Sequence, residues 1–91
     1  MQRDAAMALA QTVLIDLAGE TETMSRFLAL SGIDPQSLRQ RAHEASFLAG
    51  LIGFVMEDEA LLLAICERQR LPAADIGRAR DALAGRPPDD A

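Results

Sequence analysis

The sequence predicts an all-α fold, a small orthogonal bundle of about six short helices. Ala and Leu dominate the 91 residues and aromatic residues make up only 3%, so helix formers far outnumber strand formers. Apolar residues recur at spacings of three and four, and glycine, proline or polar residues separate the segments that carry them. Such short helices with tight turns favour crossing at large angles over the longer helices of a four-helix bundle.

The length and composition indicate a single domain with one core. The chain has 91 residues, of which 49% are apolar. We expect the helical domain to span residues 1–85 and the polar, Pro-rich residues 86–91 to form a disordered tail. The predicted helices cover residues 3–18, 22–30, 35–42, 45–56, 57–70 and 73–84.

The first predicted helix carries an apolar stripe from Met7 to Leu17, with Asp16 off the stripe, and Gly19 ends it. Asp4 and the short apolar run behind it argue against a secretory signal. In the second helix the side chains expected to face inward are Met24, Phe27, Leu28 and Leu30.

The turn after the second helix has strong capping chemistry. We expect Gly32 to adopt positive φ and to cap that helix. Asp34 is expected to cap the next one, in which Pro35 occupies the first position. Residues 35–42 then form only about two turns, with Leu38 as the main core contact.

Residues 45–56 are apolar almost all round and carry no charge, so they belong at the centre of the domain. Gly50 and Gly53 each cost about 1 kcal/mol in helix propensity, so we expect another backbone to pack closely there. The side chains expected to be excluded from solvent are Leu48, Leu51, Ile52 and Val55.

Charge complements the dipole at both ends of the fifth helix. Residues 57–59 are acidic and open it, and Arg68 and Arg70 lie at its end. Pro72 breaks the chain before the last helix, which Gly85 stops. The side chains of that last helix expected to face inward are Ile76, Ala79 and Leu83.

The net charge of −5 excludes the broad basic surface that nucleic-acid binding requires. The longest uncharged apolar run, residues 45–56, is well short of the roughly 20 residues that cross a bilayer. We therefore expect no binding to nucleic acid and no membrane span. The single cysteine forms no internal disulfide and is typical of a cytoplasmic protein.

No pattern in the chain predicts a catalytic, cofactor-binding or metal-binding residue, and we expect no enzyme. Cys66 has a buried-looking position, and His43 is its only candidate base. The acidic residues 57–59 point in different directions on a helix and cannot converge on a cation. Arg78 has Asp75 and Asp81 at three-residue spacing, which indicates a solvated ion-paired face.

Residues 32–41 are the one stretch that is similar to a helix-turn-helix, because a glycine turn precedes a basic third helix. The acidic chain and the shortness of that helix argue against this hypothesis. The side chains that it would use to read DNA are Gln36, Ser37, Arg39, Gln40 and His43.

Residues 27–39, with the sequence FLALSGIDPQSLR, carry a recognisable pattern. Together with residues 47–48, 58–62 and 71–72 they resemble a family of short bacterial proteins catalogued only as a domain of unknown function. The resemblance covers most of residues 20–84 and implies a small all-α protein of about this length. It implies no activity, cofactor or catalytic residue.

The remaining hypothesis is a small cytoplasmic helical interaction module or regulatory partner. Its ligand would be another protein, in particular a partner helix, or a second copy that forms a dimer. The alternative is a DNA-associated helix-turn-helix protein, and an enzyme of unknown type ranks third.

Overall fold

The structure, a computed structural model, describes residues 1–85, which form an all-α fold with no strand. The predicted fold class is confirmed, and most helix boundaries agree within two residues. The elements are α1 Arg3–Ala18, α2 Thr21–Ser31, the 3₁₀ turn η1 Pro35–Ser37, α3 Leu38–Arg41, α4 Ala45–Met56, α5 Glu59–Gln69 and α6 Ala73–Leu83. The helix predicted over residues 35–42 is split into η1 and α3. The predicted disordered tail, residues 86–91, lies outside the described residues.

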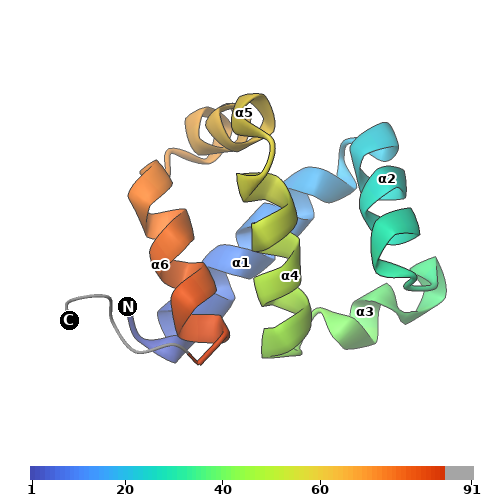
Figure 1. The fold of residues 1–91 in the computed structure, drawn as a ribbon, viewed down its shortest axis with the longest axis horizontal. Coiled ribbons are helices and arrows are strands. Elements are labelled where there is room, and N and C mark those ends of the chain that lie inside the picture. The colour runs from blue at the N-terminus through green and yellow to red at the C-terminus, as the bar shows by residue number, and fades with distance from the viewer. Residues whose placement is uncertain (86–91) are drawn as a thin grey trace.

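α4 stands at the centre of the bundle (Figure 1). α1 passes behind it, α6 packs along one side, α2 lies on the other side, and α5 and α3 lie near its two ends. α1, α4 and α6 pack against one another most extensively.

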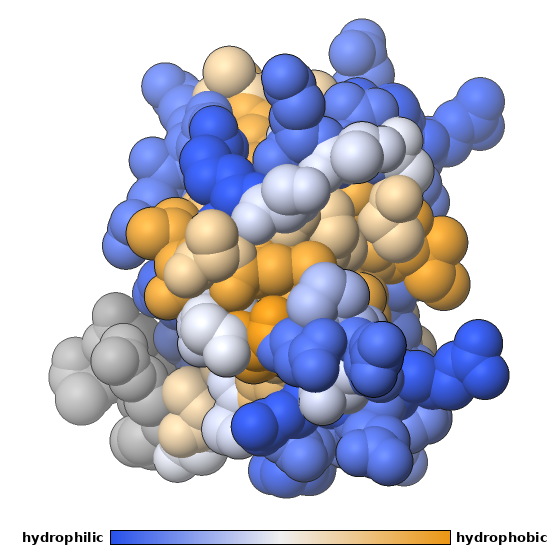
Figure 2. Space-filling view, turned by 90° about the vertical axis from the view of Figure 1, so that its right-hand side faces the viewer, coloured by the Kyte–Doolittle hydropathy of each residue, from blue (hydrophilic) through white to orange (hydrophobic). Residues whose placement is uncertain are grey.

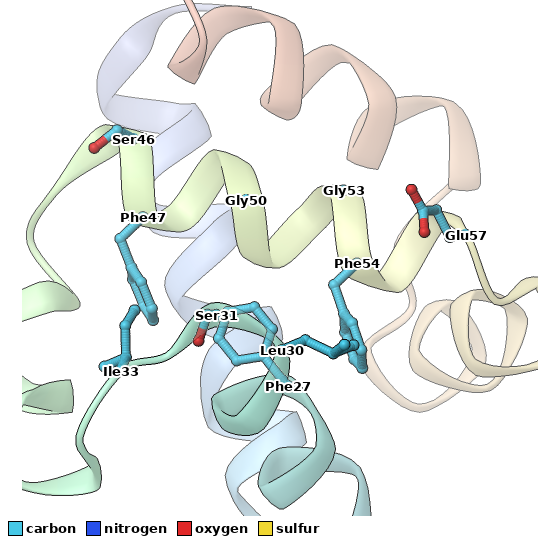
Figure 3. A pocket seen from close by; sticks show the side chains of 10 residues that line it. All are labelled: Phe27, Leu30, Ser31, Ile33, Ser46, Phe47, Gly50, Gly53, Phe54 and Glu57. Carbon is cyan, nitrogen blue, oxygen red and sulfur yellow. The ribbon is translucent and has the colours of Figure 1, made fainter.

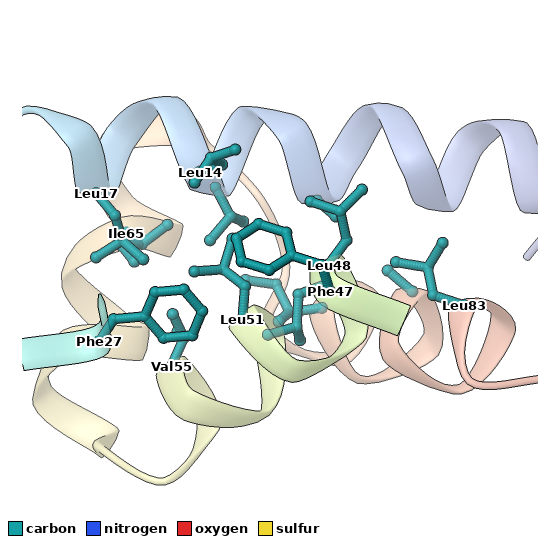
Figure 4. Packing of buried hydrophobic residues seen from close by; sticks show 14 of the residues in the cluster. Leu14, Leu17, Phe27, Phe47, Leu48, Leu51, Val55, Ile65 and Leu83 are labelled. Atoms are coloured by element: carbon teal, nitrogen blue, oxygen red, sulfur yellow. The ribbon is translucent and has the colours of Figure 1, made fainter. Parts of the chain in front are cut away.

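The core is apolar throughout, and every residue that is buried as a whole among residues 1–85 is hydrophobic. Figure 4 shows how α1 lies over the inner face of α4, with Leu14 and Leu17 facing Leu48, Leu51 and Val55. The predicted burial of α4 is confirmed, because Leu48, Leu51, Ile52 and Val55 are completely buried. The other core side chains are Ala6, Ala10, Val13, Leu14, Leu17, Met24, Phe27, Phe47, Ile65, Ile76, Ala79 and Leu83.

The turn between α2 and η1 has the predicted capping. Gly32 adopts φ +72° and its N–H donates to the carbonyl of Leu28. The Asp34 Oδ1 accepts a hydrogen bond of 3.0 Å from the backbone N–H of Gln36. Arg70 has a role that the sequence did not predict: it ends α5 in the left-handed conformation, at φ +55°. That conformation is usually left to glycine or asparagine.

Asp16 joins α1 to α5 through a polar cluster. Its side chain is only 4% exposed and accepts hydrogen bonds from Arg68 Nη2 at 2.6 Å and Nε at 3.1 Å. Gln69 Nε2 donates a third bond of 2.8 Å. The hydrogen bonds from Arg68 are the main reason that the pKa of Asp16 lies below its ordinary value. The sequence placed Asp16 off the apolar stripe but did not predict its partners.

Leu51→Ala should lower the free energy of unfolding by about 2–5 kcal/mol, because it leaves a cavity in a closely packed core. Urea denaturation measures this loss. Leu63→Ala is the matched control, because Leu63 is 54% exposed and its truncation should change stability by no more than about 0.5 kcal/mol. Equal losses for the two variants would show that the inner face of α4 is not the core.

Asp16→Asn should lower the free energy of unfolding by about 1–3 kcal/mol at neutral pH, because hydrogen bonds to a carboxylate are lost. The folded-state pKa of Asp16 lies below its unfolded value, so the ionised group stabilises the fold above the unfolded pKa. This stability disappears as the pH falls through the folded pKa.

The difference between wild type and Asp16→Asn should therefore shrink as the pH falls below about 4, in denaturant titrations run across that range. Asp75→Asn is the control, because Asp75 forms only a surface pair with Arg78 at 2.8 Å. A difference that stays constant with pH would rule out this account of the Asp16 cluster.

Candidate functional site

An open apolar groove of about 440 Å³ separates α2 from the outer face of α4. Figure 3 shows its walls: Phe47 and Phe54 point from α4 toward α2, and the ring of Phe27 lies against them. Figure 2, which views the molecule from the side of α2, shows an apolar band between two hydrophilic regions. The lining residues are Phe27, Leu30, Ser31, Ile33, Ser46, Phe47, Gly50, Gly53, Phe54 and Glu57.

All three phenylalanines of the chain form the wall between the two helices. The Phe27 ring is edge-on to Phe47, with centroids 5.6 Å apart, and tilted against Phe54 at 5.2 Å. Both distances are typical of favourable aromatic pairs. The guanidinium of Arg26 lies 5.3 Å from the Phe54 centroid and donates to Asp58 at 3.4 Å. These contacts hold α2 beside α4 while bulky rings keep the two backbones apart.

Gly50 and Gly53 line the groove on the side of α4, and the prediction for them was wrong. We expected another backbone to pack closely against both glycines, but a Cβ built on either one has no neighbour within 4 Å. The glycines therefore leave a strip of helix backbone bare. Their cost in helix propensity, about 1 kcal/mol each, is not offset by any packing among residues 1–85.

The prediction that Leu30 faces inward is also wrong, because its side chain is 73% exposed. The buried residues of α2 are Met24 and Phe27, and Leu30 lies near the end of the helix at the rim of the groove. Polar side chains mark the ends of the groove on α4, with Ser46 at one end and Glu57 at the other (Figure 3). Glu57 is the only charged residue among the lining residues.

The residues considered for catalysis are not brought together. Cys66 is half-buried on α5 and packs against the core. Burial raises the pKa of its thiol, which lowers the fraction of reactive thiolate. His43 is exposed in the turn before α4, whereas α5 follows the other end of that helix. His43, the single histidine of the chain, is therefore not placed beside the thiol.

The acidic run at residues 57–59 was predicted to open the fifth helix, but it lies at the junction of two helices, and only Asp58 and Glu59 belong to the start of α5. Glu57 ends α4, and Asp58 caps α5 by accepting a hydrogen bond of 3.1 Å from the backbone N–H of Leu61. Within residues 1–85, no group of three ligand-type side chains is placed to hold a metal ion.

The helix-turn-helix hypothesis depends on α3, which has only four residues. Arg41 is paired with Glu44 at 2.9 Å, so its charge is partly neutralised. The solvated pair predicted for Arg78 forms with Asp75, whereas Asp81 lies 3.8 Å from Arg80 instead. None of the helices within residues 1–85 has the length and apolar character needed to cross a bilayer.

The fold and the groove define a small all-α bundle with an open apolar groove between α2 and α4. Residues 3–86 match the family described as "Protein of unknown function (DUF3572)", and the chain belongs to this family. The family resemblance seen in the sequence is thereby confirmed. No curated protein and no solved structure matches the chain. The groove is therefore the feature of the molecule that points to a function.

Gly50→Ala and Gly53→Ala should each raise the free energy of unfolding by about 0.5–1 kcal/mol, because alanine favours the helix and its Cβ meets no neighbour. Thermal denaturation of dilute protein measures the gain. Gly32→Ala is the control with the opposite sign, because Gly32 has φ +72° and alanine is strained there. Destabilisation by Gly50→Ala or Gly53→Ala would mean that something packs against α4 at these positions.

Proposed function

We propose that this chain is a protein-interaction module whose groove between α2 and α4 receives one face of a helix. The observation that carries the proposal is the combination of apolar walls, a bare glycine backbone and the exposed side chain of Leu30. Burial of a leucine side chain is worth about 1.5–3 kcal/mol. A ligand that covers Leu30 gains that free energy, which the free chain leaves unused.

A helical ligand suits the shape of the groove. The lining residues of α4 extend from Ser46 to Glu57, so the groove follows most of the length of that helix. Gly50 and Gly53 let a second backbone approach α4 closely, because neither has a side chain to hold it away. Recognition of a helix by an apolar groove also needs few polar contacts, and only the rim offers them here.

The glycines lower the stability of the free domain and thereby support a binding role. Alanine at both positions would add about 1–2 kcal/mol of helix propensity without a clash. A domain of this size has only about 5–15 kcal/mol of net stability, so that difference is large. A surface whose residues make the domain less stable than simple substitutions would is typical of a functional site.

A DNA-binding role has less support than the groove. α3 has four residues, Arg41 is paired with Glu44, and the net charge of −5 opposes contact with phosphate. We also infer that the module is not an enzyme, since its single histidine, His43, is exposed before α4 and does not lie beside the thiol of Cys66. The free cysteine suits a reducing cytoplasm, where we expect the module to act.

Photo-cross-linking in cells that express the chain tests the proposal. With benzoylphenylalanine in place of Leu30, we expect discrete cross-linked protein adducts on a denaturing gel, because the ligand covers that position. Benzoylphenylalanine in place of Ile15 is the matched control, because Ile15 is also 73% exposed but lies on α1 and does not line the groove. Absence of adducts at position 30, or equal adducts at both positions, would overturn the proposal.

A further inference from the structure

We propose that the ligand of the groove is a second copy of this chain, and that two copies pack α4 against α4 in antiparallel orientation about a two-fold axis. The inference rests on the proposed function, because it names the partner for the same groove. It follows from the symmetric spacing of four α4 residues on the open side of the groove, from the position of Leu30 and from the placement of charge.

The α4 residues on the open side of the groove have a spacing that reads the same in both directions. Ser46, Gly50, Gly53 and Glu57 follow one another at intervals of four, three and four residues. An antiparallel copy centred between Gly50 and Gly53 therefore sets each glycine against the other glycine of the second chain. The two backbones then approach closely at the centre of the contact, where neither chain has a side chain.

The projecting and the recessed parts of the surface lie on the same patch. A two-fold interface uses one patch of each subunit, so that patch must be complementary to itself. Leu30 projects at the rim, and Gly50 and Gly53 form the recess beside it. In the dimer, Leu30 of each copy lies beside the glycine contact, between the walls formed by Phe47 and Phe54 of the other copy.

Charge selects the antiparallel orientation. Glu57 is the only charged lining residue, and a parallel arrangement would place the two Glu57 carboxylates together. The antiparallel arrangement separates them by about the length of α4, roughly 18 Å for twelve residues. Each Glu57 then lies at the Ser46 end of the other α4. The residue at that helix end is Glu44, whose carboxylate makes no hydrogen bond to the helix and is paired with Arg41 at 2.9 Å. The free N–H groups and the positive dipole of the helix therefore remain available to Glu57 of the other copy.

The net charge predicts different salt dependences for binding of a second copy and binding of a basic partner. Two chains that each carry −5 repel one another at long range, and salt screens that repulsion. Association of two copies should therefore strengthen as the salt concentration rises. Binding of a positively charged protein would weaken instead, because salt screens the attraction.

Sedimentation velocity of the full chain tests the dimer. From about 10 µM to about 1 mM, the range of weak association, the mass should rise from 9.8 kDa toward twice that value, and further at high salt. The double substitution Gly50→Ala, Gly53→Ala keeps the fold but holds the backbones apart, so it should weaken the dimer at least about tenfold. Gly77→Ala is the matched control, because it lies on α6, where its Cβ would contact only Met56, and should leave the dimer unchanged.

Cysteine cross-linking tests the orientation. Ser46→Cys and Glu57→Cys chains, each also carrying Cys66→Ala, are mixed and treated with a short bismaleimide after circular dichroism has verified their helix content. The mixed 46–57 product should form faster than either product of two like chains. Preferential cross-linking of like positions would overturn the antiparallel arrangement.

A chain that stays monomeric over the whole concentration range, or a dimer that is insensitive to the double glycine substitution, would overturn the inference. A different result would reject the proposed function, which requires cross-linked adducts at position 30 but does not depend on the mass of the partner. Adducts of a different protein at that position, with a monomeric purified chain, would keep the interaction module and reject the second copy.

Discussion

The packing of the inner face of α4 against α1 and α6 is the interaction on which the rest of the structure depends. Four residues of that face are completely buried, and they contact helices from both ends of the chain. Within residues 1–85 no helix exceeds 16 residues, and isolated helices shorter than about 12–15 residues are marginal in water. Tertiary packing around α4 therefore stabilises the helices, and propensity alone does not.

The same arrangement leaves the outer face of α4 partly open. α2 is held there by phenylalanine rings and by the Arg26–Asp58 pair, and it covers only part of that face. A single apolar helix thus contributes both to the core and to the open groove. This arrangement is economical for a 91-residue chain, because so small a domain has little apolar surface to spare for a separate pocket.

Periodicity and capping predicted the parts of the fold that depend on neighbouring residues. The absence of charge in residues 45–56 correctly located the centre of the domain, and Gly32 and Asp34 correctly located the turn after α2. The groove escaped prediction because a helix that is apolar all round gives no sign of which side stays open. Gly50 and Gly53 illustrate the limit: a missing side chain permits either close packing or an empty recess. Asp16 and Arg68 are 52 residues apart, and no local pattern pairs them.

Native-state hydrogen exchange tests the central role of α4 most directly. If its inner face anchors the bundle, the backbone amides of α4 should exchange only through global unfolding, with a free energy equal to that from denaturant titration. Amides of α3 and of the end of α2 should open at lower free energies, because they bury little apolar surface. Exchange of α4 through local opening, at a lower free energy than α1 or α6, would contradict this account.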